Sequence, residues 1–143
     1  MALKGMTKNA RSGMHYGNTR IEFDSNKNRC RILAESLLEY IEYMRLEYDP
    51  DVVSYTPHPG VIIVADENEN RHKSIFDAEL IMADGSIVYE EIKYSKELQD
   101  EDSRSYRQVR LQEEWCRKEG YEYKVVTEKE VADNPVFFNN CLR

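Results

Sequence analysis

The chain has 143 residues, which is enough for one domain with a real hydrophobic core and too few for two domains of ordinary size. Its formal net charge of −7 disfavours a nucleic-acid partner unless the basic residues are clustered, because attraction to phosphates needs grouped Lys and Arg. No apolar run approaches the roughly 20 residues that span a bilayer, and the N-terminus lacks the apolar stretch of a signal peptide. We therefore expect a soluble, cytoplasmic protein with no membrane partner.

The basic residues are concentrated at the N-terminus. Residues 1–31 hold seven basic and two acidic side chains, a net charge of +5, whereas the remainder of the chain carries a net charge of −12. We predict a basic arm over residues 1–30 that follows a phosphate backbone, with Lys27 and Arg29 as candidate DNA contacts. The alternative interpretation is a solvated tail. Residues 31–143 are then the folded domain.

The first predicted element is a helix over 31–48, where apolar side chains recur at helical spacing and an Asp-Pro pair ends the pattern. The predicted apolar stripe consists of Leu33, Leu37, Tyr40, Ile41, Met44 and Tyr48. Two short strands are predicted at 51–55 and 60–65, on either side of a proline-containing break. A polar turn at 66–70 follows them.

Two longer runs, 73–82 and 86–95, also have the composition of strands, and the Ala-Asp-Gly sequence between them predicts a hairpin turn. A helix is predicted over 102–119, with Gly120 as its C-cap. A strand at 121–127 and two short helical pieces, one of them NPVFFNN, complete the chain. This succession of helices and strands indicates an α/β fold with a mixed central sheet flanked by helices.

Ionised side chains on these predicted strands suggest chemistry, because charges are rarely buried unless they pair or bind a metal. The hairpin places Asp77 near the cross-strand neighbours of Glu91 and Lys93, and the strand period puts Glu91 and Lys93 on one face. Two carboxylates here would hold a hard divalent cation such as Mg²⁺, which activates a water that the Lys93 ammonium orients toward phosphorus. The alternative is a half-exposed hairpin whose charges pair across the strands.

These residues belong to a longer pattern that covers most of the chain. It comprises SNKNRCR, AESLLEYIEYMRLEYDPDVVSYTPHP, FDAEL, EEIK, WCRKEGYEYKVVTEKEV and NPVFFNN, in this order. In this pattern the chain resembles the PD-(D/E)xK nuclease superfamily and, within it, the N-terminal catalytic domain of the TnsA-like transposon endonucleases. The resemblance implies a restriction-endonuclease-like fold and a metal-dependent DNA endonuclease. It also suggests an origin in a phage or another mobile element of a bacterial cell, with location in the virion as an alternative for a phage protein.

The resemblance also implies roles for individual residues. Carried over to this sequence, it makes Glu35, Asp77, Glu91 and Lys93 the catalytic residues. Asp77, Glu91, Glu35 and the backbone carbonyl of Ile92 would bind Mg²⁺, for which Mn²⁺ is a possible substitute.

Three positions depart from the family pattern or have a competing interpretation. Phe76 stands where a proline usually precedes the strand Asp. His58 stands where the family usually has Gln, and because it lies between two prolines we interpret it as a turn residue. Glu35 shares a helical line with Glu39 and Glu42, which is also typical of a face in contact with water.

Further DNA contacts are predicted on the helix over 102–119, where Arg104, Arg107, Gln108 and Arg110 would lie beside the phosphates. Their alternative role is that of solvated side chains paired with neighbouring acids. The transposon protein carries a further C-terminal domain for partner proteins, and this chain ends at Arg143. Besides DNA, two kinds of partner therefore remain as alternatives: a second copy of the chain, in a homodimer, or a transposase or phage protein complex. The competing function is a nuclease-like structural or assembly subunit of a phage particle or transposition complex, with weak or lost cleavage.

Overall fold

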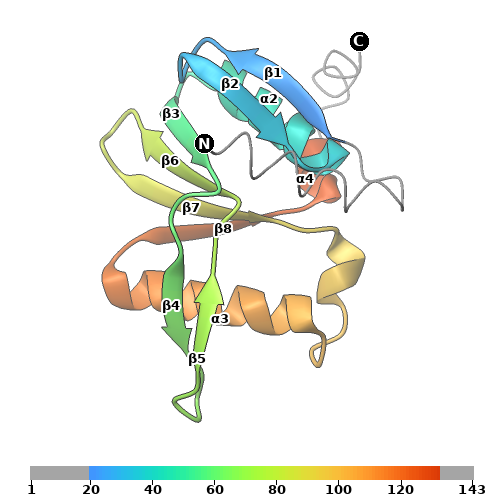
Figure 1. The fold of residues 1–143 in the computed structure, drawn as a ribbon, viewed down its shortest axis with the longest axis vertical. Helices are drawn as coiled ribbons and strands as arrows, with labels where there is room; N and C mark the ends of the chain where they lie inside the picture. Colours follow the sequence, from blue (N-terminus) through green and yellow to red (C-terminus); the bar gives the residue numbers. More distant parts are fainter. Residues whose placement is uncertain (1–19, 133–143) are drawn as a thin grey trace.

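The computed structural model describes residues 20–132, which form an α/β structure (Figure 1). In chain order the elements are β1 (Ile21–Ser25), β2 (Cys30–Ala34), α2 (Leu37–Tyr48), β3 (Val52–Pro57), β4 (Ile62–Ala65), β5 (Arg71–Ser74), β6 (Ala78–Met82), β7 (Ile87–Ile92), the 3₁₀ helix η2 (Ser95–Leu98), α3 (Arg104–Glu119), β8 (Glu122–Val126) and α4 (Glu128–Ala132). Within this range no helix combines the length and apolar character needed to cross a bilayer.

The central sheet has the strand order β3-β6-β7-β8. Strand β6 is antiparallel to both of its neighbours, β3 and β7, whereas β8 runs parallel to β7, so the predicted mixed sheet is confirmed. The predicted hairpin is confirmed as β6 and β7, in which Ala78 pairs with Glu90. Gly85 in its turn has φ of +87°, a backbone conformation that glycine adopts without a steric cost.

Helices cover both faces of this sheet. Figure 1 shows α2, with the β1–β2 hairpin, on one side of the sheet and α3 on the other. The core between α2 and the sheet includes Leu38 and Ile41 from the helix and Leu80 and Val88 from the strands, all less than a tenth exposed. Burial of such apolar side chains is the main favourable term in folding.

The face toward α3 is aromatic. The fully buried ring of Phe76 stacks on Tyr89 with 4.4 Å between ring centroids, and it also contacts the rings of Trp115 and Tyr123. Phe76 directly precedes Asp77 in the sequence. The aromatic layer therefore fixes the chain at the point where it enters β6.

The predicted helix over 31–48 is wrong in its first third. Residues Cys30–Ala34 form β2, paired with β1, and the helix begins only at Leu37. Ser36 sets this start, because its side chain accepts a hydrogen bond from the backbone N–H of Glu39 at 3.1 Å, as N-cap residues do.

The predicted apolar stripe of this helix is also partly wrong. Leu37 and Tyr48 are exposed, while the side chains buried along α2 are Leu38, Ile41, Glu42, Tyr43 and Leu46. The helix is therefore rotated relative to the prediction, and Glu42, which the competing interpretation put on a face in contact with water, is completely buried.

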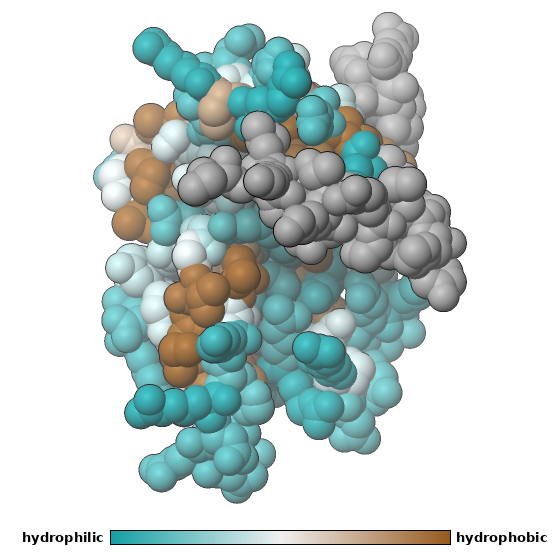
Figure 2. Space-filling view, in the orientation of Figure 1, coloured by the Kyte–Doolittle hydropathy of each residue, from teal (hydrophilic) through white to brown (hydrophobic). Residues whose placement is uncertain are grey.

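The predicted strand over 73–82 is interrupted. Its first part is β5, which pairs with β4 in a separate two-stranded sheet, and its second part is β6. Figure 2 shows apolar side chains gathered over the β4–β5 hairpin, where Val61, Ile63 and Ile75 are exposed. The interruption leaves Asp77 between the two strands.

The predicted N-terminal arm is only partly described. Its residues 21–25 form β1, which belongs to the folded unit, and residues 1–19 lie outside the described range. The helical piece predicted for NPVFFNN also lies outside that range.

Candidate active site

Asp77 is held by contacts from several elements. Its backbone N–H donates to the carbonyl of Glu90 at 3.0 Å, and its own carbonyl accepts from the N–H of His58 and the hydroxyl of Tyr43 at 3.0 and 2.9 Å. Its carboxylate oxygen Oδ2 accepts from the backbone N–H of Ile92 at 2.7 Å. These bonds tie the residue to α2, to the end of β3 and to β7, so the direction of its carboxylate is defined.

Glu91 and Lys93 lie on the α3 side of β7, as the period of a strand requires. The Lys93 ammonium is 3.5 Å from Oε2 of Glu91, whose side chain is only 3% exposed. Buried Gln112 of α3 donates to Oε1 of Glu91 at 3.3 Å and to the Ser74 hydroxyl at 2.9 Å, while its own carbonyl accepts from Tyr123 at 2.6 Å. The Glu91 carboxylate is therefore oriented from two sides.

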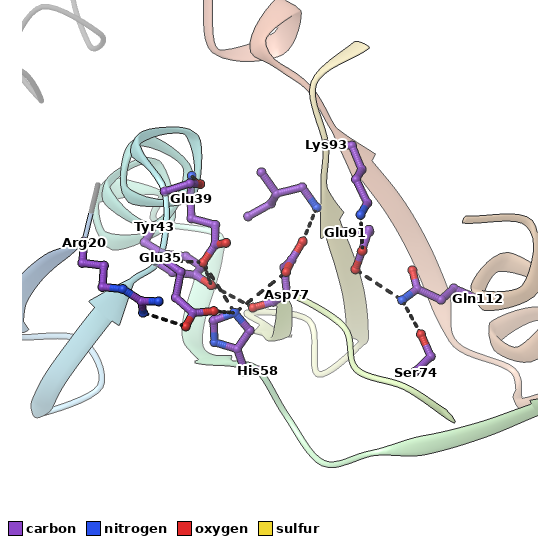
Figure 3. Close-up of polar contacts among 12 residues, drawn as sticks. Arg20, Glu35, Glu39, Tyr43, His58, Ser74, Asp77, Glu91, Lys93 and Gln112 are labelled. Atoms are coloured by element: carbon purple, nitrogen blue, oxygen red, sulfur yellow. Dashed lines mark hydrogen bonds and ion pairs between the residues drawn. The ribbon is translucent and has the colours of Figure 1, made fainter. Parts of the chain in front are cut away.

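Glu35 and Glu39 approach Asp77 from the start of α2 (Figure 3). Glu35 directly precedes the N-cap, and Glu39 lies in the first turn. Together with His58, which follows β3, they form a group whose ligand atoms all lie within 4.8 Å of one another and which can hold a metal ion. Arg20 pairs with Glu35 at 3.1 Å and limits the negative charge of this group.

The electrostatics of these residues favour a bound cation. Burial, together with the carboxylates of Glu91 and Glu39, raises the pKa of Asp77 to about 8. Burial also raises the pKa of Glu91, against the opposing effect of Lys93, and the neighbouring Glu39 carboxylate raises the pKa of His58. Ionisation of the carboxyl groups in this site is thus disfavoured when no cation is bound. Oxygen-rich donor sets of this kind suit a hard divalent ion.

Figure 3 shows how the predicted catalytic residues are arranged. Asp77 lies between Glu35, which precedes α2, and the pair formed by Glu91 of β7 and Lys93, which directly follows β7. The N–H of Ile92 contacts Asp77, which places the Ile92 peptide beside the carboxylates. The use of these residues as ligands, including the Ile92 carbonyl, stays a prediction.

The DNA contacts predicted on α3 lie mostly on its surface. Arg104, Arg107 and Arg110 are exposed, and Gln108 is half-buried. Arg110 donates to the Tyr106 hydroxyl at 3.4 Å and lies over the same ring. This helix therefore presents cations to the solvent, and a DNA contact through them stays a prediction.

The DNA contacts predicted in the arm have different surroundings. The Lys27 ammonium donates to the backbone carbonyls of Leu46 and Asp49 at 2.7 and 2.6 Å, which satisfies carbonyls at the end of α2. Arg29 is exposed in the β1–β2 turn, where its φ is +55°. Lys27 thus has a role within the fold, whereas the Arg29 side chain faces solvent.

Our sequence reasoning missed Glu39, His58 and Gln112. The signal for Glu39 was its position four residues after Glu35, since this spacing puts two side chains on one side of a helical turn. Gln112 and Cys116 are the buried residues of α3, and their spacing of four puts them on one side of the helix. For His58 no pattern within the sequence was informative, because its partners come from distant segments.

Comparison with known proteins identifies the family of the chain. The model of the family described as TnsA-like endonuclease N terminal matches residues 49–128, more than half of the chain. A search of curated proteins found no match. The matched segment contains His58, Asp77, Glu91 and Lys93, and Glu35 lies shortly before it. The family implies a nuclease, hence a hydrolase with a nucleic-acid substrate, and the chain belongs to the TnsA-like endonuclease N-terminal family.

Proposed function

We propose that this protein is a divalent-metal-dependent DNA endonuclease that hydrolyses phosphodiester bonds. The proposal includes a restriction-endonuclease-like fold, with Mg²⁺ as the expected ion and Mn²⁺ as a substitute. The likeness to a transposon endonuclease supports an origin in a phage or another mobile element.

The observation that carries the proposal is the position of Asp77. Its backbone and carboxylate are held by hydrogen bonds from α2, the end of β3 and β7, and its Oδ1 lies 3.9 Å from Nε2 of His58. Burial and the carboxylates of Glu91 and Glu39 raise its pKa. A chain that needed these acids only for stability would keep them apart, because like charges brought together destabilise one another. Such a convergence is typical of functional sites.

Asp77, Glu91, Glu35 and the Ile92 carbonyl are the residues that would hold the ion. When bound, a divalent ion lowers the pKa of water and neutralises charge on the phosphate. Lys93 would donate hydrogen bonds that stabilise a phosphate oxygen or orient the attacking water, and its 3.5 Å distance from Glu91 keeps the ammonium beside the carboxylates. Gln112 would keep the Glu91 carboxylate in a fixed orientation.

DNA is the proposed substrate, and the exposed arginines of α3 are the proposed contacts for its phosphates. A contact of this kind would fix the position of the backbone without selecting a sequence. A second copy of the chain, or a transposase or phage protein, is the proposed further partner, since one active site cuts one strand at a time.

Incubation with supercoiled plasmid tests the proposal. The full chain should nick the plasmid in the presence of Mg²⁺ or Mn²⁺ and not in the presence of EDTA. The Asp77→Ala and Lys93→Ala variants should lose at least about 10²-fold in rate, the upper end of what loss of an outer-shell partner causes.

Two other outcomes would overturn the proposal. Equal nicking by all three proteins would identify a contaminating nuclease. If the unaltered chain cut neither plasmid, linear DNA nor single-stranded DNA with either ion, a structural or assembly role would replace the enzymatic one.

A further inference from the structure

His58 occupies an unusual position beside the carboxylates. It follows β3 directly, between Pro57 and Pro59, and its φ of +48° is uncommon for a residue other than glycine. Its backbone N–H donates to the Asp77 carbonyl at 3.0 Å. The imidazole is therefore fixed at its base, and a quarter of the side chain is exposed.

The ring nitrogen Nε2 faces three carboxylates. It lies 3.5 Å from Oε1 of Glu39, 3.8 Å from Oε2 of Glu35 and 3.9 Å from Oδ1 of Asp77 (Figure 3). These distances exceed those of ordinary hydrogen bonds to oxygen, which are about 2.7–3.2 Å. The ring thus points toward the three carboxylates without a short hydrogen bond to any one of them.

The same distances suit donors that share one ion. Donors at about 2.2 Å from an octahedral ion are separated by about 3 Å when adjacent and about 4.4 Å when opposite. The ligand atoms of Glu35, Glu39 and His58 lie within 4.8 Å of one another, which leaves space for an ion after small side-chain movements. The Asp77 oxygen nearest to His58 is not the one that accepts from Ile92.

We propose that His58 is a nitrogen ligand of the ion held by Glu35 and Glu39, and that this ligand makes the site prefer Mn²⁺ to Mg²⁺. Mg²⁺ favours oxygen ligands and dehydrates reluctantly, whereas transition-metal ions accept imidazole readily. The carboxylates around His58 keep the donor set hard enough for Mn²⁺. Coordination of the ion by His58 does not depend on the proposed function, whereas a role of this ion in cleavage does.

Pulsed electron paramagnetic resonance of the full chain loaded with Mn²⁺ tests the coordination directly. A bound imidazole gives a nitrogen hyperfine coupling, and we expect this coupling in the unaltered protein. It should vanish in His58→Asn, a variant chosen because Asn tolerates positive φ and retains an oxygen donor. His72→Asn is the matched control, since His72 pairs with Asp66 on the β4–β5 hairpin, and it should keep the coupling.

Calorimetric titration with each metal alone measures the preference. The ratio of the Mn²⁺ to the Mg²⁺ affinity should fall by about tenfold in His58→Asn, mainly through weaker Mn²⁺ binding, and should not change in His72→Asn. Circular dichroism establishes that the variants are folded. If His58→Asn did not fold, the presence or absence of nitrogen coupling in the unaltered protein would still decide.

The outcomes separate this inference from the proposed function. Plasmid cleavage without nitrogen coupling in the Mn²⁺-loaded protein would overturn the ligand role of His58 and leave the nuclease intact. Nitrogen coupling that His58→Asn abolishes, in a protein that cuts no DNA, would support the ligand role and refute the nuclease. Coupling that persists in His58→Asn would also overturn the inference.

Discussion

Two groups of acidic side chains lie on opposite faces of β7, and they have different surroundings. On the α2 face, Glu90 and Glu42 are at most 1% exposed, and Arg45 binds both oxygens of Glu42 at 2.6 Å. On the α3 face, Glu91 lies beside Lys93, and the neighbouring Asp77 retains contact with solvent. The first group is closed, whereas the second, the accessible group, reaches solvent through Asp77 and Lys93.

The comparison shows why burial of an acid does not by itself indicate chemistry. A fork of hydrogen bonds from Arg45 compensates the Glu42 charge within the protein, and Arg45 also lies 3.8 Å from Glu90. Around Asp77, by contrast, the His58 ring and the Lys93 ammonium lie at distances of 3.5 Å or more from their acidic neighbours. Uncompensated acids at an accessible position are suited to an external cation.

The largest effect on stability should follow from loss of Arg45. We expect Arg45→Ala to lower the free energy of unfolding by about 3–5 kcal/mol, because it leaves the buried Glu42 carboxylate without its partner. Urea unfolding followed by circular dichroism measures this change. Arg117→Ala, which breaks an exposed pair with Glu114, is the control and should have no measurable effect. Equal effects of both substitutions would show that Glu42 is not sealed from water.

Loss of Gln112 should weaken metal binding at the accessible group. Gln112→Leu removes the donor to Glu91, and we expect the affinity for Mn²⁺ or Mg²⁺ to fall by about 10–100-fold, the usual cost of losing an outer-shell partner. Calorimetric titration of the metal measures the affinity. The exposed neighbour Glu113, substituted by Gln, is the control. An unchanged affinity in Gln112→Leu would mean that Glu91 needs no orientation or is not a ligand.

The accessible group should also make the metal-free protein sensitive to pH. The folded-state pKa of Asp77 is raised to about 8, so the folded protein keeps a proton that the unfolded chain has lost above pH 4. Stability should therefore fall as the pH rises from 5 to 8, with a slope that approaches about 1.4 kcal/mol per pH unit for this one proton. The raised pKa of His58 acts in the same direction, because its stabilising charge is lost as the pH rises.

Urea unfolding at several pH values in EDTA measures this slope, and Asp77→Asn should reduce it. Addition of metal should oppose the loss, because an ion that binds the folded state stabilises it. A metal-free protein that becomes more stable between pH 5 and 8 would contradict the raised pKa of Asp77.

The smallest effect should come from Glu90. Burial, followed by the neighbouring Glu42 carboxylate, raises the pKa of Glu90 well above its usual value and so favours the neutral form of this group. Glu90→Gln preserves this neutral shape, and we expect the free energy of unfolding at pH 7 to change by less than about 1 kcal/mol. A loss as large as that of Arg45→Ala would instead identify Glu90 as an ionised partner of Arg45.

Much of the central sheet could be predicted because its signals are local. The Asp-Gly turn specifies the β6–β7 hairpin, and Gly120 ends α3 with φ of +82° as expected of a C-cap. The start of α2 could not be predicted as readily, because the apolar pattern of residues 31–34 suits a helix as well as a strand. Pairing with β1, a tertiary contact, decides between them.

The site shows the same difference between local signals, which allow prediction, and contacts between distant segments, which do not. Asp77, Glu91 and Lys93 share one hairpin, so their proximity followed from its register. His58 and Gln112 come to the site from the end of β3 and from α3. Spacing within the sequence does not predict such contacts between distant elements. The burial of Glu42 likewise depends on how α2 is rotated against the sheet.

Phe76 links the aromatic layer to the catalytic candidates. A proline at this position would restrict the backbone covalently, at every temperature, whereas Phe76 is held by its contacts with Tyr89 and Trp115. Contacts of this kind act only while the core is intact, and a fully buried residue of the core becomes free only when the whole domain unfolds. The orientation of the adjoining Asp77 should consequently be lost in the same thermal transition as the fold itself.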